Sequence, residues 1–137
     1  MYTARSANFI LKAQNIGENI ITFFGSIGKD ERGRYLQKDL TENGINIRIQ
    51  QVDEEDTSAC AILVLDKERT MCCDLAAAKS YSMEHLKANM DAMKGAKIIY
   101  TTSYFMFSSN DIMMHALNYA IENDIPVGFN LSAEYTI

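Results

Sequence analysis

A single arginine stands at the predicted tip of a β-hairpin. Residues 58–65 and 70–75 predict two antiparallel strands, joined by the polar loop 66–69, whose sequence is Asp-Lys-Glu-Arg. A guanidinium offers paired donors in a fixed fork and a permanent charge, so Arg69 could close over a phosphate. The residues alone favour the alternative, a solvated side chain in a charged turn.

A run of aromatic residues follows the next short apolar segment. Residues 97–101 predict a strand, and residues 103–109 then spell Ser-Tyr-Phe-Met-Phe-Ser-Ser. Ligands bind beyond the carboxyl ends of parallel strands in open α/β sheets. An aromatic ring there could stack on a base, an interaction worth about 1–3 kcal/mol. Packing of the following helix explains the same residues equally well.

Two further features could contact a polar ligand. Asn8 lies in the first turn of a helix predicted over residues 6–16, where it could hold a ligand hydroxyl or serve as a cap. Gly25 and Gly28 follow an apolar strand predicted over residues 20–24. They lack the third glycine of a dinucleotide fingerprint and the Gly-Lys-Ser/Thr of a P-loop, so a tight turn is preferred to a phosphate cradle.

The elements that must position these residues alternate along the chain. Asp30 and Ser82 are candidate N-caps of two helices. The remaining predicted elements are helices over 31–43, 82–94 and 111–123, a strand with strict period two over 45–52, and a last strand over 127–131. This order predicts an α/β fold, a three-layer α/β/α sandwich with right-handed crossovers. The patch over residues 45–75 predicts a small separate sheet inserted into it.

Composition excludes several classes of partner and site. The net charge of -5, with no basic cluster, argues against nucleic acid, and no apolar run approaches the roughly 20 residues that span a bilayer. The N-terminus has no signal-peptide pattern, so we expect a cytoplasmic protein, with the nucleus as a second location. Three cysteines without Cys-x-x-Cys spacing and only two histidines predict reduced thiols and no metal site.

Several motifs resemble those of the ribokinase-like (PfkB) carbohydrate and purine kinases. A strand that ends in Gly-x-[Ile/Val]-Gly-x-Asp-x-x-Gly is typical of that family, and residues 25–33 fit it. The resemblance extends from about Ser6 to Ala133 and is strongest to the adenosine kinase branch. Its other pieces are Thr57-x-x-Cys60-Ala61, Arg69 followed by Leu75-Ala76-Ala77-Ala78, and Phe129-Asn130-Leu131-Ser132-Ala133.

The resemblance implies a role for each candidate residue. Asn8 matches an asparagine that binds the ribose hydroxyls, and Phe105 matches the aromatic residue that stacks on adenine. Cys60 and Met71 match lid positions that cover the nucleoside, and Arg69 matches a lid arginine that approaches the transferring phosphate. The complete enzyme would use ATP and Mg²⁺ to phosphorylate the 5'-hydroxyl of adenosine, giving AMP in purine salvage. The lid strands would lie at about 45–53 and 57–75.

The chain also departs from the family pattern. Thr3 and Ala4 occupy the positions of a di-glycine, where their side chains would crowd a nucleoside, and Glu134 replaces a proline. The family is more than twice as long, and its C-terminal half carries the catalytic aspartate, the anion hole and the ATP pocket. We therefore expect a partial kinase domain over residues 1–137, inactive alone, that self-associates through an exposed sheet edge.

Two alternatives to an adenosine kinase remain open. One is a kinase of the same family for another nucleoside or a sugar. The other is a non-catalytic, truncated binding protein. The aromatic Phe105 and the Asn-Leu-Ser-Ala run favour a purine nucleoside over a sugar.

Overall fold

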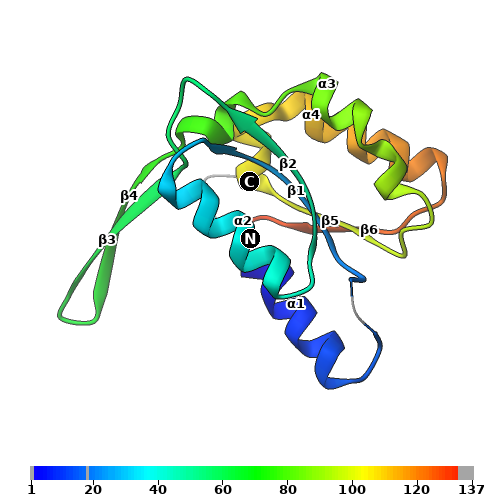
Figure 1. Ribbon diagram of the computed structural model, residues 1–137, viewed down its shortest axis with the longest axis horizontal. Coiled ribbons are helices and arrows are strands. Elements are labelled where there is room, and N and C mark those ends of the chain that lie inside the picture. Colours follow the sequence, from blue (N-terminus) through cyan, green and yellow to red (C-terminus); the bar gives the residue numbers. More distant parts are fainter. Residues whose placement is uncertain (1, 18, 133–137) are drawn as a thin grey trace. The chain divides into compact units, whose positions relative to one another are not determined.

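The computed structural model describes residues 2–17 and 19–132, which form a mixed α/β fold in the predicted order of elements (Figure 1). Ala133, the last residue of the family resemblance, and Glu134, which departs from it, lie outside the described residues. The chain divides into two compact units, residues 1–80 and 81–137, and each is described by itself. None of the described helices has both the length and the hydropathy needed to cross a membrane.

The first unit is built on a parallel pair of strands joined by a helix. Strand β1 (Thr22–Gly28) pairs with β2 (Asn46–Val52) in the register Thr22↔Asn46 to Gly28↔Val52, and α2 (Glu31–Glu42) connects them. The prediction that residues 45–53 lie outside this sheet is therefore wrong. Six of the seven β2 residues are half-buried, so the period-two pattern does not mark one solvated face.

Strand β1 continues four residues beyond its predicted end. Gly25 pairs with Ile49 and Gly28 with Val52, so the predicted Gly-x-x-Gly turn is wrong and both glycines lie within the strand. A Cβ on Gly28 would collide with the backbone of Glu55 and Thr57. Glycine is found in strands where another backbone approaches closely, and that is its role at position 28.

Helix boundaries follow local signals in part. Asp30 caps α2, as predicted, by accepting a hydrogen bond from the Gly33 amide at 2.8 Å. Helix α1 (Tyr2–Ala13) begins four residues before its predicted start, and its buried residue is Asn8. The helix ends at Ala13, three residues before the end of the predicted range, and Asn15 takes a positive φ of 55°.

Residues 59–74 form a two-stranded antiparallel hairpin. Strands β3 (Ala59–Leu65) and β4 (Glu68–Asp74) are joined by Asp66 and Lys67 alone, whose φ values are 48° and 73°. Positive φ at both central residues is the geometry of the tight turn that matches strand twist. The predicted four-residue loop is thus two residues long. All residues of both strands are exposed, and Figure 1 shows the hairpin as an arm that continues into η1 (Ala76–Ser80).

The second unit repeats the strand–helix–strand pattern. Strand β5 (Ile99–Thr102) pairs in parallel with β6 (Val127–Asn130), and α4 (Ser103–Glu122) connects them. Helix α4 begins directly after β5, eight residues before the predicted start, and Ser109 interrupts it with φ -161° and ψ 71°. The predicted helix over 82–94 is divided into α3 (Met83–Ala88), capped by Ser82 as predicted, and η2 (Met90–Met93).

The mixed α/β class is confirmed, but the predicted sandwich is not. Among the described residues each of the three sheets has two strands, so a continuous sheet with helices on both faces is not formed by them. Each unit nevertheless buries apolar side chains of its own. In the first unit these include Ile27, Leu40 and Ile45; in the second they include Leu86, Met93, Ile112, Met113 and Ala120.

We predict that Gly28→Ala destabilises the chain by about 1–3 kcal/mol, the usual cost of overpacking a filled site. The new Cβ would meet the backbone of Glu55 and Thr57, which cannot rotate away. Gly25→Ala is the matched control, because its Cβ would meet only the Phe23 ring, at 3.1 Å. Urea unfolding followed by far-UV circular dichroism measures both variants. Equal losses of unfolding free energy would contradict the role assigned to Gly28.

Candidate functional site

One face of the hairpin carries three of the residues predicted to contact substrate. Cross-strand partners lie on the same face of a sheet, as do alternate residues along one strand. Cys60, Met71 and Arg69 therefore share a face, in that order from the base of the hairpin toward its tip. The register pairs on this surface, which we call the Arg69 face, are Cys60–Cys73, Ile62–Met71 and Val64–Arg69.

Arg69 itself lies in β4 and not in the turn. It is opposite Val64, two residues beyond Lys67, because the turn is shorter than predicted. Among the described residues no carboxylate forms an ion pair with it, so its guanidinium remains available to an anion. Whether that anion is a phosphate stays a prediction.

The hairpin also holds a disulfide, which the sequence analysis did not predict. Cys60 and Cys73 are direct cross-strand partners and are joined through their sulfurs, so the prediction of reduced thiols is wrong for this pair. Cys72 is a free, exposed thiol on the opposite face. On the Arg69 face, Cys60 therefore presents a disulfide sulfur in place of a thiol.

The aromatic run begins the helix of the second unit. Ser103 is fully buried, and its hydroxyl donates to the Leu131 carbonyl at 2.6 Å, which ties the start of α4 to the segment after β6. Phe105 is half-buried and lies two residues further on, beyond the carboxyl ends of β5 and β6. Phe105 thus packs within the unit and keeps part of its surface exposed, while its stacking on a base stays a prediction.

Tyr81 supports Phe105 and was missed in the sequence. The two rings meet edge to face with centroids 6.0 Å apart, and Tyr81 meets His85 in the same way at 5.6 Å. Tyr81 is 5% exposed, and its hydroxyl makes no hydrogen bond with the described residues. Burial raises the pKa of Tyr81 to about 12. No local pattern marks Tyr81, which lies 24 residues before its partner.

Asn8 occupies a structural position. Its side chain is buried, and its amide nitrogen donates to the Asn43 carbonyl at 2.6 Å, next to the Lys12 ammonium at 2.7 Å from the same oxygen. Both donors satisfy a carbonyl that the end of α2 leaves free, and a cation is favourable there. Asn8 thus contributes to a cap, although on α2 and not on its own helix, and a contact of its side-chain oxygen with a ligand stays a prediction.

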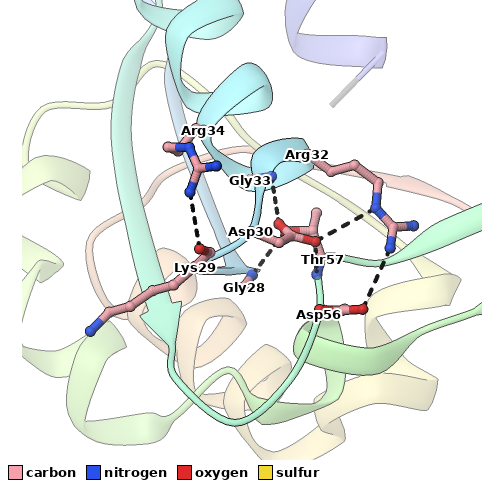
Figure 2. Close-up of polar contacts among 8 residues, drawn as sticks. All are labelled: Gly28, Lys29, Asp30, Arg32, Gly33, Arg34, Asp56 and Thr57. Carbon is pink, nitrogen blue, oxygen red and sulfur yellow. Dashed lines mark hydrogen bonds and ion pairs between the residues drawn. The ribbon is translucent and has the colours of Figure 1, made fainter.

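The most complete polar cluster lies where β1 ends, α2 begins and the hairpin starts (Figure 2). The Thr57 hydroxyl donates to Asp30 Oδ1 at 2.6 Å, and the Thr57 amide donates to Asp30 Oδ2 at 3.0 Å. The same hydroxyl accepts from the Gly28 amide at 3.0 Å. One carboxylate and one hydroxyl thus join three segments, and we call this arrangement the Asp30–Thr57 junction.

At the junction, one arginine lies between two carboxylates, those of Asp30 and Asp56. Arg32 Nε lies 3.5 Å from Asp30 Oδ2, and Arg32 Nη2 lies 3.6 Å from Asp56 Oδ2. The Thr57 hydroxyl, followed by the Gly33 and Thr57 amides and by Arg32, lowers the pKa of Asp30 from 3.8 to about 2, against the opposing effect of burial. Asp30 is therefore ionised at neutral pH and its oxygens are engaged, so it serves as a structural acceptor.

The described residues do not fit the cofactors that the resemblance implies. They contain no group of three or more His, Cys, Asp or Glu side chains that could hold a metal ion, so this part of the chain supplies no Mg²⁺ ligand set. The space beside Gly28, where a phosphate cradle would lie, is filled by the backbone of residues 55–57. We therefore derive no chemical step through ATP or Mg²⁺ from these residues.

Comparison with known proteins places the chain among sugar and nucleoside kinases. A family model described as pfkB family carbohydrate kinase matches residues 6–132. The adenosine kinase of Dictyostelium discoideum is 31% identical over 137 residues, covering 98% of this chain and 39% of that protein. Adenosine kinase 2 of Arabidopsis thaliana is 31% identical over 116 residues, covering 83% of this chain and 34% of that protein. The chain thus spans less than two fifths of the length of these relatives.

Solved structures give the same result. The crystal structure of Anopheles gambiae adenosine kinase in complex with P1,P4-di(adenosine-5) tetraphosphate matches with a TM-score of 0.87 at 32% identity. The match covers 97% of this chain and 38% of that one. An adenosine kinase from Schistosoma mansoni in complex with 2-fluoroadenosine matches with a TM-score of 0.90 at 24% identity, over 97% of this chain and 38% of that one, and shares the fold.

The Asp30–Thr57 junction predicts a specific loss of stability in acid. Because the pKa of Asp30 is lowered from 3.8 to about 2 in the folded chain, its contribution is complete above about pH 4 and is lost as pH falls toward 2. The difference in unfolding free energy between the natural chain and Asp30→Asn should therefore shrink over that range. Urea unfolding at pH 5, 4, 3 and 2 measures it.

The control for this experiment is Asp53→Asn. Asp53 is 69% exposed on its side chain, and among the described residues its ion pair is with Lys29, so its removal should change stability little at any of these pH values. A difference for Asp30→Asn that stays constant from pH 5 to 2 would contradict the lowered pKa.

The three cysteines should differ in reactivity. Without reductant, an alkylating reagent should label Cys72 alone, and Cys60 and Cys73 should become reactive only after reduction, because they are joined in the hairpin. Peptide mapping by mass spectrometry measures the sites labelled before and after reduction. Full labelling of Cys60 in the unreduced protein would show that the pair is not formed.

Proposed function

Because this chain belongs to the pfkB family of carbohydrate kinases, we propose that it is the nucleoside-facing part of an adenosine phosphotransferase. Family membership, inferred above from motifs, is confirmed by the match over residues 6–132. The observation that carries the finer proposal is Phe105, an aromatic ring beyond the carboxyl ends of a parallel strand pair. The chain that carries it is about 30% identical to adenosine kinases.

Each candidate residue then has a role in holding the nucleoside. Phe105 stacks on adenine, and the edge contact with Tyr81 fixes the plane of its ring. On the Arg69 face of the hairpin, Met71 and the Cys60 sulfur cover the nucleoside, while Arg69 directs its charge toward the phosphate that is transferred. Asn8 approaches the ribose hydroxyls with its side-chain oxygen, since its nitrogen is engaged with Asn43.

The chemistry assigned to this chain is binding and orientation. Phosphoryl transfer depends on the positions of the reacting groups and on stabilising the charge of the transferring group. The candidate residues of this chain orient the acceptor nucleoside, and the Arg69 guanidinium contributes to stabilising the charge of the transferring group. In the complete enzyme we propose a three-layer α/β/α core, with the hairpin as a lid and with ATP and Mg²⁺ bound by other parts of the fold. We expect no ATP-dependent phosphorylation of adenosine by the 137-residue chain alone.

The proposal predicts that the purified chain binds adenosine and that Phe105→Ala weakens binding. Loss of a stacking ring costs about 1–3 kcal/mol, so the dissociation constant should rise roughly 5- to 150-fold. Isothermal titration calorimetry measures it. Phe107→Ala is the matched control, because Phe107 belongs to the same aromatic run but is 54% exposed. Equal effects of the two substitutions would contradict the role of Phe105.

Two further measurements distinguish the alternative functions. Binding of ribose as tightly as adenosine would favour a sugar kinase of the same family, and binding of neither would favour a non-catalytic interaction protein. An assay with ATP and adenosine tests for transfer, and measurable AMP would overturn the expectation that the chain is inactive alone. Size-exclusion chromatography is run first, because the exposed apolar residues of the hairpin, Ile62, Leu63, Val64 and Leu65, favour self-association.

A further inference from the structure

The hairpin is joined to the first unit almost entirely through its base. All residues of β3 and β4 are exposed, and the extensive contacts of each strand are with the other. The arm therefore has no packed face that could set its direction within the first unit (Figure 1). Its direction depends on two short segments, residues 56–58 and 75–77, which we call the two legs.

The first leg is held by the Asp30–Thr57 junction. Thr57 is 3% exposed, and both its hydroxyl and its amide donate to the Asp30 carboxylate, at 2.6 and 3.0 Å. The hydroxyl also accepts from the Gly28 amide, so the leg is attached to the last residue of β1 as well as to the cap of α2. In Figure 2 the Asp30 carboxylate lies between the Gly33 amide and Thr57, and the Gly28 amide is directed at the Thr57 hydroxyl.

The second leg is attached to the same strand. The Ser26 hydroxyl donates to the Ala77 carbonyl at 2.6 Å, and Ser26 lies two residues before Gly28 in β1. The legs are also bonded to each other, since the Ala77 amide donates to the Asp56 carbonyl at 3.1 Å and the Ser58 hydroxyl donates to the Leu75 carbonyl. The legs therefore form one base, which Thr57 anchors by its two hydrogen bonds to the ionised Asp30 carboxylate.

A small rotation at this base has a large effect further along the arm. Arg69 is five register positions from the Ala59–Asp74 pair, which is about 17 Å at about 3.4 Å per residue. A rotation of about 10° at the base would then move Arg69 by about 3 Å along an arc. Misplacing a reacting group by about 1 Å can cost about 100-fold in rate, so the base must be held firmly for the Arg69 face to act.

We propose that Thr57 and Asp30 are positioning residues that set the direction of the hairpin and thereby hold the Arg69 face in place for the nucleoside. This inference rests on the proposed function for the identity of the ligand, but the direction of the arm can be measured without any ligand. The hydroxyl of Thr57 is the essential group, because it is donor to Asp30 and acceptor from Gly28 at once.

The direct test measures a distance from the hairpin to α2. Spin labels are attached to Glu68→Cys, near the tip, and Lys38→Cys, on α2, in a Cys72→Ser background without reductant, and pulsed electron paramagnetic resonance gives the distance distribution. In the natural sequence and in Thr57→Ser, which keeps the hydroxyl, the distribution should be narrow. In Thr57→Val, which has the same shape but no hydroxyl, it should be at least twice as broad.

The matched control is Thr70→Val. Thr70 is exposed on the opposite side of the hairpin from Arg69 and is bonded to neither leg by its side chain, so the distribution should not change. If Thr57→Val does not fold by circular dichroism, Asp30→Asn carries the test, because its amide group cannot accept from both donors of Thr57. An unchanged width in the folded variant, or equal broadening in Thr57→Ser, would overturn the proposal.

Adenosine binding provides the second readout. Thr57→Val should raise the dissociation constant at least tenfold, while Thr57→Ser stays within about threefold of the natural chain. A broadened distance distribution with unchanged adenosine affinity would overturn the positioning role, because a loose arm would then bind as well as a fixed one. If no form binds adenosine, the proposed function fails, and the distance measurement still decides whether Thr57 and Asp30 direct the hairpin.

Discussion

The Asp30 carboxylate joins the start of α2 to a leg of the hairpin that lies 27 residues further along the chain. It accepts from the Gly33 amide at the start of α2 and from both the amide and the hydroxyl of Thr57. Asp30 is only 21% exposed on its side chain, so these bonds replace most of the water that an isolated carboxylate would hold. The position of the hairpin, and with it the Arg69 face, depends on this one shared acceptor.

Two glycines of the first unit, Gly28 and Gly33, serve the same junction. A Cβ on Gly28 would meet the backbone of residues 55–57, and a Cβ on Gly33 would meet the Gly28 carbonyl and the Thr57 hydroxyl. The family motif in residues 25–33 is therefore a packing motif in this chain, since it lets a leg of the hairpin lie directly on the end of β1. A phosphate cradle would need that space to be open.

Local signals in the sequence predicted the elements better than their partners. The caps at Asp30 and Ser82, the order of the elements and the paired strands of the hairpin follow from nearby residues, and they were correct. The partner of Asp30 lies 27 residues away, and no local pattern reveals it. The end of β1 and the start of α4 were missed because tertiary pairing extends a strand through glycines and a helix through an aromatic run.

The candidate site was predicted less completely than the fold, for a related physical reason. Residue types marked Arg69 and Phe105, but the shared face of Cys60, Met71 and Arg69 follows from cross-strand register, which a one-residue change in turn length would invert. The disulfide follows from the same register, because it places Cys60 directly opposite Cys73. Tyr81 was not predicted at all, since its contact with Phe105 joins residues 24 positions apart that no local pattern links.

The division between a packed base and an exposed arm explains how one chain can combine a firm fold with an open binding surface. Apolar residues on the arm, such as Ile62 and Val64, are exposed and not packed in the core of the first unit, so they can contact a ligand or another protein surface. Such an arm would sample many directions if its base were held by packing alone. Charged and buried hydrogen bonds depend on direction as well as distance, so the Asp30–Thr57 junction restricts rotation in a way that apolar contacts cannot.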